Sequence, residues 1–281
     1  MLNLSSVGSR TEPRTFSYDW KDLALYAMGI GATTEELDYV YEARGPKVIP
    51  TFAVVPAMSH LFECLKMADV PLASVVHGAQ KVVAHGAAPS KGALTTAAEV
   101  TGIYDLKRFA QVVVHTESKL GSGELLFETE WSVIVRGAGG FGGNPPPKGE
   151  DASVPERESL WRVEQATRPE QALMYRLSGD INPLHIDPEV ARAVGFERGP
   201  ILHGLATFGF ATRAMIAKAC GGDASRLQEI AGQFRKPVWP GETLLTEAWE
   251  TEPGKLVFQV RVKERDEVVI GSAWARIGAV G

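Results

Sequence analysis

The stretch ILHGLATFGFATRAMIAKAC, residues 201–220, decides the fold. It predicts a helix of about five turns that is apolar on every side, the composition of a helix buried inside a protein. His203, Arg213 and Lys218 interrupt it, so it is too polar to span a bilayer and we expect no membrane insertion. A buried helix of this length needs a sheet that curves around it.

The chain after this helix can supply that sheet. Turn residues at 240–242 and 252–254 separate strand-like segments. Every second residue from Leu256 to Val262 is apolar, so one face of that segment is buried. The four segments are EIAGQFRKPVWP (229–240), ETLLTEAWET (242–251), KLVFQVRVKER (255–265) and EVVIGSAWARIG (267–278). A long helix followed by an antiparallel sheet predicts an α+β fold.

The first half of the chain is rich in β-branched residues from Val75 onward. Its segments, separated by turn residues, indicate antiparallel strands at 75–83, 93–106, 109–118 and 124–136. Before them, 19–28 has the spacing of a short amphipathic helix, 37–41 and 49–55 resemble extended chain, and 60–68 could form one or two helical turns. We therefore expect this half to be poor in helix.

The glycine-rich run GAGGFGG (137–143) contains a GxGxxG pattern directly after a predicted strand. A dinucleotide site needs this loop to open a helix, and the following Asn-Pro-Pro-Pro cannot start one promptly. The run is better interpreted as a passage between domains. We predict a loosely held tail at 1–15, an N-terminal domain at 16–143, a linker at 144–157 and a C-terminal domain at 158–281. A weak repeat, GAQK at 78–81 and GQFR at 232–235, suggests that the two domains arose by duplication.

Composition and charge exclude several classes of protein. The formal net charge is -5 and no long basic run is present, so no nucleic-acid partner is expected. Cys64 and Cys220 have no metal-site spacing and are expected to be buried apolar residues. The first residues lack the apolar core of a signal peptide, so we predict a cytoplasmic protein.

The segment YRLSGDINPLHIDP (175–188) has the densest chemistry in the chain. Pro183 fixes its own backbone and keeps Asn182 out of the helical region, so Asp180 and His185 should be held on one irregular turn. Such a turn can aim two proton-transfer groups at one point. The plainer interpretation is a polar turn in which Asp187 caps a short helix beginning at Pro188. Both fit the segment.

These motifs together resemble the MaoC-like dehydratases, specifically the two-domain R-specific enoyl-CoA hydratase 2 group. The resemblance lies in SGDINPLHIDP (178–188), PILHGLATFGFATR (200–213) and FRKPVWPGETL (234–244), and in the first half in LALYAMGIGA, VIPTFAVVP, HGAQ and GGFGG. It covers about residue 18 to the C-terminus. It implies a double hot dog fold, two sheets each wrapped around a helix, with the helix reduced in the N-terminal repeat.

The resemblance also implies an activity. Similar enzymes add water to a trans-2-enoyl-CoA and form the (3R)-3-hydroxyacyl-CoA during β-oxidation of fatty acids or steroid side chains, without a metal or redox cofactor. By the family pattern Asp180 and His185 are the catalytic pair, and Asn182 holds the water or the histidine. Gly204, at the start of the buried helix, is expected to donate its N–H to the thioester enolate. His203 is expected to be a structural neighbour.

The same pattern assigns acyl-CoA contacts to the N-terminal domain and to one residue of the C-terminal domain. They are His77, Gly78, Lys107 and Phe234, with Lys107 near the CoA phosphates. The HGAQ motif departs from the more usual HGEQ and removes one carboxylate from the CoA path. An acyl-CoA substrate and a homodimer are the partners expected.

Two other functions fit parts of the pattern. Hot dog folds also host acyl-CoA thioesterases, in which a carboxylate activates water against the thioester carbonyl. The paired Asp180 and His185 make this less favourable. A non-catalytic acyl-CoA-binding subunit would be favoured if either of these residues had been replaced, and neither is.

Overall fold

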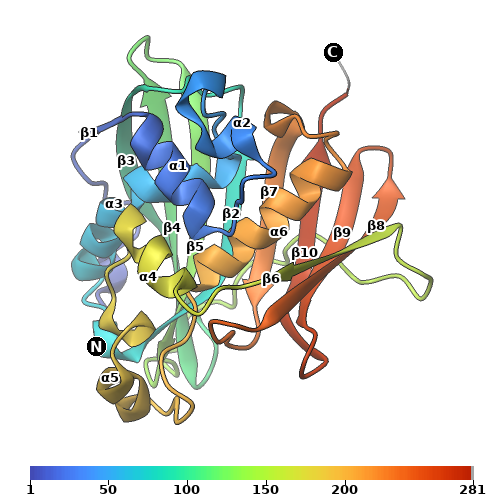
Figure 1. Cartoon of the computed structure of the whole chain (residues 1–281). Coiled ribbons are helices and arrows are strands. Elements are labelled where there is room, and N and C mark those ends of the chain that lie inside the picture. Colours follow the sequence, from blue (N-terminus) through green and yellow to red (C-terminus); the bar gives the residue numbers. More distant parts are fainter. Residues whose placement is uncertain (280–281) are drawn as a thin grey trace.

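The computed structural model describes residues 1–279. Both halves of the chain contribute strands to one antiparallel ten-stranded sheet (Figure 1). Residues 280–281, the end of the predicted C-terminal domain, lie outside the described part. The strand order is β1-β3-β4-β5-β2-β7-β10-β9-β8-β6. The first-half strands are β1 (Arg14–Tyr18), β2 (Val75–Ala84), β3 (Gly92–Asp105), β4 (Phe109–Leu120) and β5 (Leu125–Arg136). The second-half strands are β6 (Trp161–Ala166), β7 (Leu227–Phe234), β8 (Thr243–Glu252), β9 (Lys255–Val262) and β10 (Glu267–Ile277).

The two halves of the chain are structural repeats. Each has a short strand, then a long helix, then four strands, and the two meet where β2 pairs with β7. Counting outward from this junction gives β2-β5-β4-β3-β1 in one half and β7-β10-β9-β8-β6 in the other. The predicted α+β double hot dog arrangement is therefore confirmed.

The long helix of the second repeat is α6 (Gly204–Lys218), buried along nearly all of its length as its composition requires. Helix α3 (Val54–Met67) holds the equivalent place in the first repeat and packs on β3, β4 and β5. The expectation of a reduced helix there was wrong, because α3 is 14 residues long against 15 for α6. Pro56 falls in the first turn of α3, where its missing N–H would have no intrahelical acceptor anyway.

The remaining α-helices lie in the connections that precede α3 and α6, and the 3-10 turns η4 and η7 follow these two helices. They are α1 (Trp20–Gly29), α2 (Leu37–Val40), α4 (Gln171–Tyr175) and α5 (Pro188–Ala193), with 3-10 turns η1 (Leu4–Ser6), η2 (Glu42–Arg44), η3 (Pro50–Ala53), η4 (Leu72–Ser74), η5 (Arg176–Ser178), η6 (Pro183–His185) and η7 (Ala224–Arg226). Residues 37–41 and 49–55, predicted to be extended, contain α2 and η3 instead. The first half is thus not poor in helix. Among the described residues, no helix has both the length and the apolarity needed to cross a membrane.

The weak sequence repeat marks the junction of the two halves. Ala79 pairs with Gln233 and Gln80 with Gly232 across β2 and β7. A Cβ on Gly78 would lie 2.8 Å from Ile134, and one on Gly232 would lie 2.8 Å from Ile270. Glycine therefore serves the same purpose in both motifs, which is close packing of an isoleucine from the next strand.

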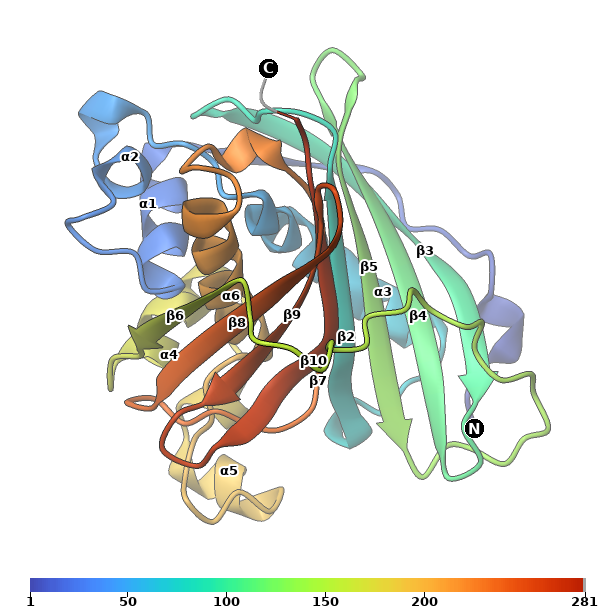
Figure 2. The same cartoon turned by 90° about the vertical axis from the view of Figure 1, so that its right-hand side faces the viewer.

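The N-terminal tail is more ordered than the sequence suggested, and the passage between the two repeats lies against the sheet. The N-terminal residues, predicted to be loose, are tied to the first repeat: Asn3 N–H donates to Ala68 O at 3.0 Å, and buried Thr11 donates its N–H to Ala98 O at 2.9 Å. The segment from 137 to 160 contains no helix and crosses the sheet face away from α6 (Figure 2), with Glu150 ion-paired to Lys255.

The GxGxxG loop has a structural purpose. The N–H groups of Gly140 and Gly142 donate to the two carboxylate oxygens of Asp105, at 2.9 and 2.8 Å. These hydrogen bonds hold the pKa of the Asp105 carboxyl below its usual value, and the bond from Gly140 has the largest effect. The loop therefore surrounds a carboxylate of its own chain.

Candidate active site

The segment 175–188 forms a stiff irregular turn between α4 and α5. Gly179 takes a left-handed conformation with φ of 119°, which favours glycine. Asn182 caps η6 by accepting from Leu184 N–H at 3.1 Å. Asp187 caps α5 through Glu189 N–H at 2.8 Å, as predicted. In the described part of the chain, the Asp180 carboxylate caps no helix and accepts only a long hydrogen bond from Asn182 N–H, at 3.3 Å, so it remains able to take part in chemistry with the His185 ring.

His185 is buried, and one hydrogen bond determines its tautomer. Its Nδ1 lies 2.8 Å from Ile201 O, which can only accept, so Nδ1 carries the proton and Nε2 has a free lone pair. Burial lowers the pKa of His185, while the Asp180 charge and the bond to Ile201 O oppose that shift. The ring is therefore neutral near pH 7 and can accept a proton at Nε2.

His203, the residue before α6, lies directly against His185. The two rings are stacked, with centroids 3.7 Å apart and planes at 27°. His203 Nε2–H donates to the backbone carbonyl of Asp180 at 3.0 Å. Burial and the neighbouring His185 lower the pKa of His203 to about 2, so this ring stays neutral. His203 thus links the start of α6 to the backbone that carries Asp180.

The same three side chains are the only described group of His, Cys, Asp and Glu residues whose arrangement could hold a metal ion. One ligand atom from each of Asp180, His185 and His203 lies within 4.8 Å of the others. Because the two imidazoles are stacked with centroids 3.7 Å apart, their lone pairs lie in two separate ring planes, a poor geometry for holding one ion at about 2 Å. The arrangement fits proton transfer better than coordination.

Gly204 opens α6 beside this group. The N–H groups of a first helical turn lack intrahelical acceptors, so Gly204 can donate to a ligand. A Cβ here would lie 3.2 Å from the ring of Phe234, whose centroid is 4.7 Å from that of His77. His77 also stacks on Trp131 at 5.3 Å. The structure therefore brings predicted residues of β2, β7 and α6 together.

Two predicted contacts stand apart from this cluster. Gly78 follows His77 on β2, and its α-carbon faces Ile134 of β5. Lys107 is exposed in the β3–β4 turn with φ of 67°, and its N–H donates to Asp105 at 2.7 Å. No described contact joins Lys107 to Asp180, His185 or His77.

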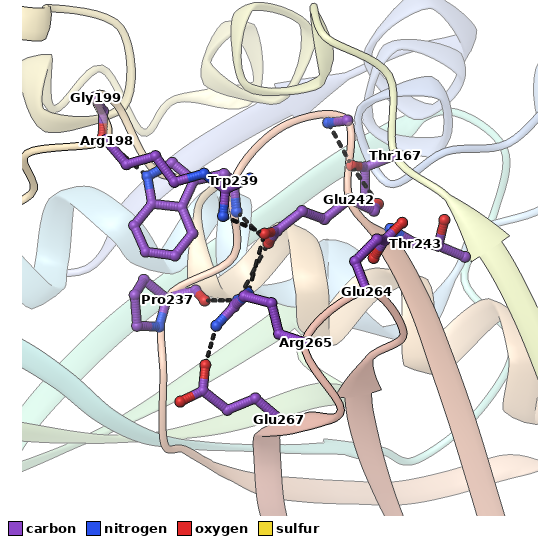
Figure 3. A network of polar contacts seen from close by, with 11 residues as sticks. Thr167, Arg198, Gly199, Pro237, Trp239, Glu242, Thr243, Glu264, Arg265 and Glu267 are labelled. Atoms are coloured by element: carbon purple, nitrogen blue, oxygen red, sulfur yellow. Dashed lines mark hydrogen bonds and ion pairs between the residues drawn. The ribbon is translucent and has the colours of Figure 1, made fainter.

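Sequence reasoning missed a polar network beside the loop that precedes α6. Figure 3 shows Glu242 at its centre, in contact with Arg198 and Arg265 and near Trp239. The signal was the glutamate after the Pro-Gly turn of FRKPVWPGETL, which we had used only as a turn residue and as part of a family motif.

Comparison with known proteins decides the family. The MaoC like domain model matches residues 150–273, and the MFE-2 hydratase 2 N-terminal domain model matches residues 16–137. "Enoyl-CoA hydratase 2, peroxisomal" of Arabidopsis thaliana is 40% identical over 91% of this chain and 89% of its own length. The chain belongs to the MaoC-like dehydratase family, in its enoyl-CoA hydratase 2 group.

Other members of the hydratase 2 group and its structural neighbours agree. "3-hydroxyacyl-thioester dehydratase Y" of Mycobacterium tuberculosis is 40% identical, with 94% of this chain and 93% of that protein covered. The crystal structure of a MaoC-like dehydratase from Phytophthora capsici superposes with a TM-score of 0.88 and 32% identity, over 98% of this chain and 97% of that one.

Proposed function

We propose that this hydratase 2 family member is an R-specific 2-enoyl-CoA hydratase. It adds water to a trans-2-enoyl-CoA and forms the (3R)-3-hydroxyacyl-CoA in β-oxidation of fatty acids or steroid side chains. One observation carries the proposal: a carboxylate oxygen of Asp180 and a ring nitrogen of neutral His185 lie within 4.8 Å of each other, and His203, stacked on His185, directly precedes the first N–H groups of α6. An acid–base pair beside an oxyanion donor is what hydration of a thioester-conjugated double bond requires.

The pair acts on one water molecule. As the water oxygen bonds to C3, the pair takes one proton from the water, and the electrons of the C2=C3 π bond move toward the thioester oxygen. The pair then delivers that proton to C2 and returns to its starting state. One water O–H bond and the π bond break, and the C3–O and C2–H bonds form. Negative charge on the thioester oxygen is stabilised by Gly204 N–H at the positive end of the α6 dipole. Asn182 holds the water or the histidine ring.

Acyl-CoA contacts follow from the same cluster. His77 and Phe234, in contact with each other and next to Gly204, flank the thioester. Gly78 lets the chain approach β5 closely there. The family pattern alone assigns Lys107 to the CoA phosphates, so Lys107→Ala should raise KM for acyl-CoA without changing kcat.

The enzyme works without a metal or redox cofactor in this proposal, and it acts as a homodimer in the cytoplasm. Cys64 and Cys220 are both free and buried, as predicted, which is compatible with a reducing compartment. The Arabidopsis relative is named peroxisomal, so the cellular location of a fluorescent fusion is the measurement that settles the compartment. Light scattering of the purified protein gives the number of subunits.

Product analysis tests the function. The purified protein is given crotonyl-CoA, longer enoyl-CoAs and a sterol-bearing enoyl-CoA, and the product is offered to 3R- and 3S-specific dehydrogenases. The proposal predicts a product that only the 3R enzyme consumes. Consumption by the 3S enzyme contradicts it. Release of free CoA thiol instead would assign the chain as a thioesterase, and binding without turnover would assign it as an acyl-CoA-binding subunit.

A further inference from the structure

The loop that joins α5 to α6 sets the geometry of the proposed catalytic histidine. Ile201 O accepts from His185 Nδ1 at 2.8 Å, and His203 and Gly204 follow directly. The loop is fastened on both sides of Ile201. The Trp239 indole N–H donates to Gly199 O at 3.2 Å, and Leu202 N–H donates to Val238 O at 2.7 Å. The position of the Ile201 carbonyl therefore depends on the segment 238–239.

A single buried carboxylate holds that segment in place (Figure 3). Glu242 is only 4% exposed. Its Oε2 accepts from Trp239 N–H at 2.9 Å, which closes the turn 239–242. Burial alone would raise the pKa of Glu242, but hydrogen bonds from Arg265, Trp239 and Arg198 outweigh burial and lower it. The carboxylate is therefore charged at neutral pH.

Two arginines complete the network. Arg265 reaches both Glu242 oxygens, at 3.0 and 3.1 Å, and also donates to Pro237 O at 2.8 Å. Arg198, in the loop itself, contacts Glu242 Oε1. The guanidinium carbons of Arg198 and Arg265 lie 4.5 and 5.1 Å from the centre of the Trp239 ring. Arg198 thus connects the start of the loop to the same carboxylate that accepts from Trp239 N–H.

We infer that Glu242, acting with Trp239 and Arg198, is a positioning residue for His185. It fixes the loop 199–203 so that Ile201 O keeps the His185 proton on Nδ1 and leaves Nε2 free beside Asp180. None of the three residues touches the reacting atoms. The inference deepens the proposed hydratase function and rests on the role of His185 in it.

The most direct test reads the tautomer of His185. The protein has six histidines, and ¹⁵N-histidine labelling with two-bond ¹⁵N–¹H spectra distinguishes Nδ1–H from Nε2–H rings. His185→Gln identifies the His185 signal. The unaltered protein should show the Nδ1–H form. Trp239→Phe keeps the ring but removes the donor to Gly199 O, and should give a mixture of both tautomers.

Kinetics provide a second readout. Trp239→Phe, Arg198→Met and Glu242→Gln should lower kcat by about 10- to 100-fold, the usual cost of misplacing a reacting group by about 1 Å, with KM little changed. Arg198→Lys should recover part of the loss.

Lys263→Met is the matched control, because Lys263 lies just after β9 and pairs with Glu164 on the surface. This variant should leave both kcat and the His185 tautomer unchanged. If Glu242→Gln does not fold, Trp239→Phe and Arg198→Met carry the test.

Two outcomes overturn the inference. One is an unchanged Nδ1–H tautomer with unchanged kcat in the folded Trp239→Phe and Arg198→Met variants, even if both proteins melt at a lower temperature. The other is a loss of kcat that Lys263→Met reproduces. The tautomer does not depend on turnover, so a protein that fails to hydrate enoyl-CoA refutes the proposed function without affecting the tautomer result.

Discussion

The two repeats use the same scaffold but differ at the start of their long helices. In the second repeat, α6 begins at Gly204, which packs against Phe234 and directly follows His203, the residue stacked on His185. In the first, α3 follows η3, whose residues are almost completely buried, and Pro56 removes one donor from the first turn. A helix N-terminus can stabilise an oxyanion only where a ligand can reach it. The fold therefore offers two such positions, and only one is open for chemistry.

The connections before the two helices differ in the same way. The second-repeat connection carries the segment 180–185. The first-repeat connection packs against α6 instead: Arg213 donates to Ile30 O at 3.0 Å and to Glu36 at 3.0 Å, and Ile30 lies against Gly209. One repeat thus provides the proposed catalytic groups, while the other packs against the helix that follows them.

The largest expected effect separates the histidines of the two repeats. Asp180→Asn and His185→Gln should each lower kcat by about 10²- to 10⁴-fold, the usual contribution of a positioned acid or base. His60→Gln in α3 is the matched control, because His60 is buried and bonded to Thr11 at 2.7 Å. It should lower the free energy of unfolding by about 1–3 kcal/mol while kcat stays near that of the unaltered protein. Equal losses of kcat in all three variants would remove the distinction between the repeats.

Acid should destabilise the protein through histidines of both repeats. The pKa of His77 is lowered to about 4 and that of His203 to about 2. Both lie below the unfolded value of about 6.5, so the unfolded chain binds more protons as the pH falls. The free energy of unfolding therefore falls as the pH drops below about 6.5, by up to about 1.4 kcal/mol per pH unit for each histidine. Urea unfolding at pH 7, 6 and 5 should show this slope, and His77→Gln should flatten it. A stability that does not change between pH 7 and pH 5 would refute the burial of these rings.

Two glycines of α6 should separate stability from activity. A Cβ on Gly209 would lie 2.3 Å from Ile30, so Gly209→Ala should destabilise the protein by about 1–3 kcal/mol through overpacking, with kcat retained. A Cβ on Gly204 would lie 3.2 Å from Phe234, so Gly204→Ala should lower kcat more than stability. Unfolding curves and initial rates of the two variants check this. The reverse pattern would exclude Gly204 as the oxyanion donor.

The smallest expected effect is that of metal removal. Dialysis against a chelator should leave kcat and KM unchanged, because the proposed reaction uses only side chains, a backbone N–H and water. A loss of activity that added metal restores would contradict this and would point to the cluster of Asp180, His185 and His203.

Those features of the fold that depend on local pattern could be predicted from the sequence. The strands from β2 to β5 and from β7 to β10 alternate or are rich in β-branched residues, and α6 is apolar on every side. Helix α3 was predicted only as one or two turns at 60–68, because VVP at its start resembles extended chain and tertiary packing overrides that preference. The predicted tail was ordered because its partners, Ala68 and Ala98, lie far along the chain.

The residues of the site also differ in how far they could be predicted from the sequence. Asp180, Asn182 and His185 lie within one stiff segment, so their proximity follows from the sequence. His77, Phe234 and Gly204 come together only through the pairing of β2 with β7, and family resemblance had to supply them. The Glu242 network joins residues 198, 239, 242 and 265, which lie in separate segments of the chain, so the local pattern marks the glutamate but does not reveal its partners.

The most direct test of the central claim, that Asp180 and His185 act together on one water, is the hydration rate of the double variant Asp180→Asn/His185→Gln beside the two single variants. Groups that act as a unit are strongly non-additive. The double variant should therefore be about as slow as the slower single variant, with the fold intact by circular dichroism. Single variants that keep the full rate, or single losses that multiply in the double variant, would contradict the claim.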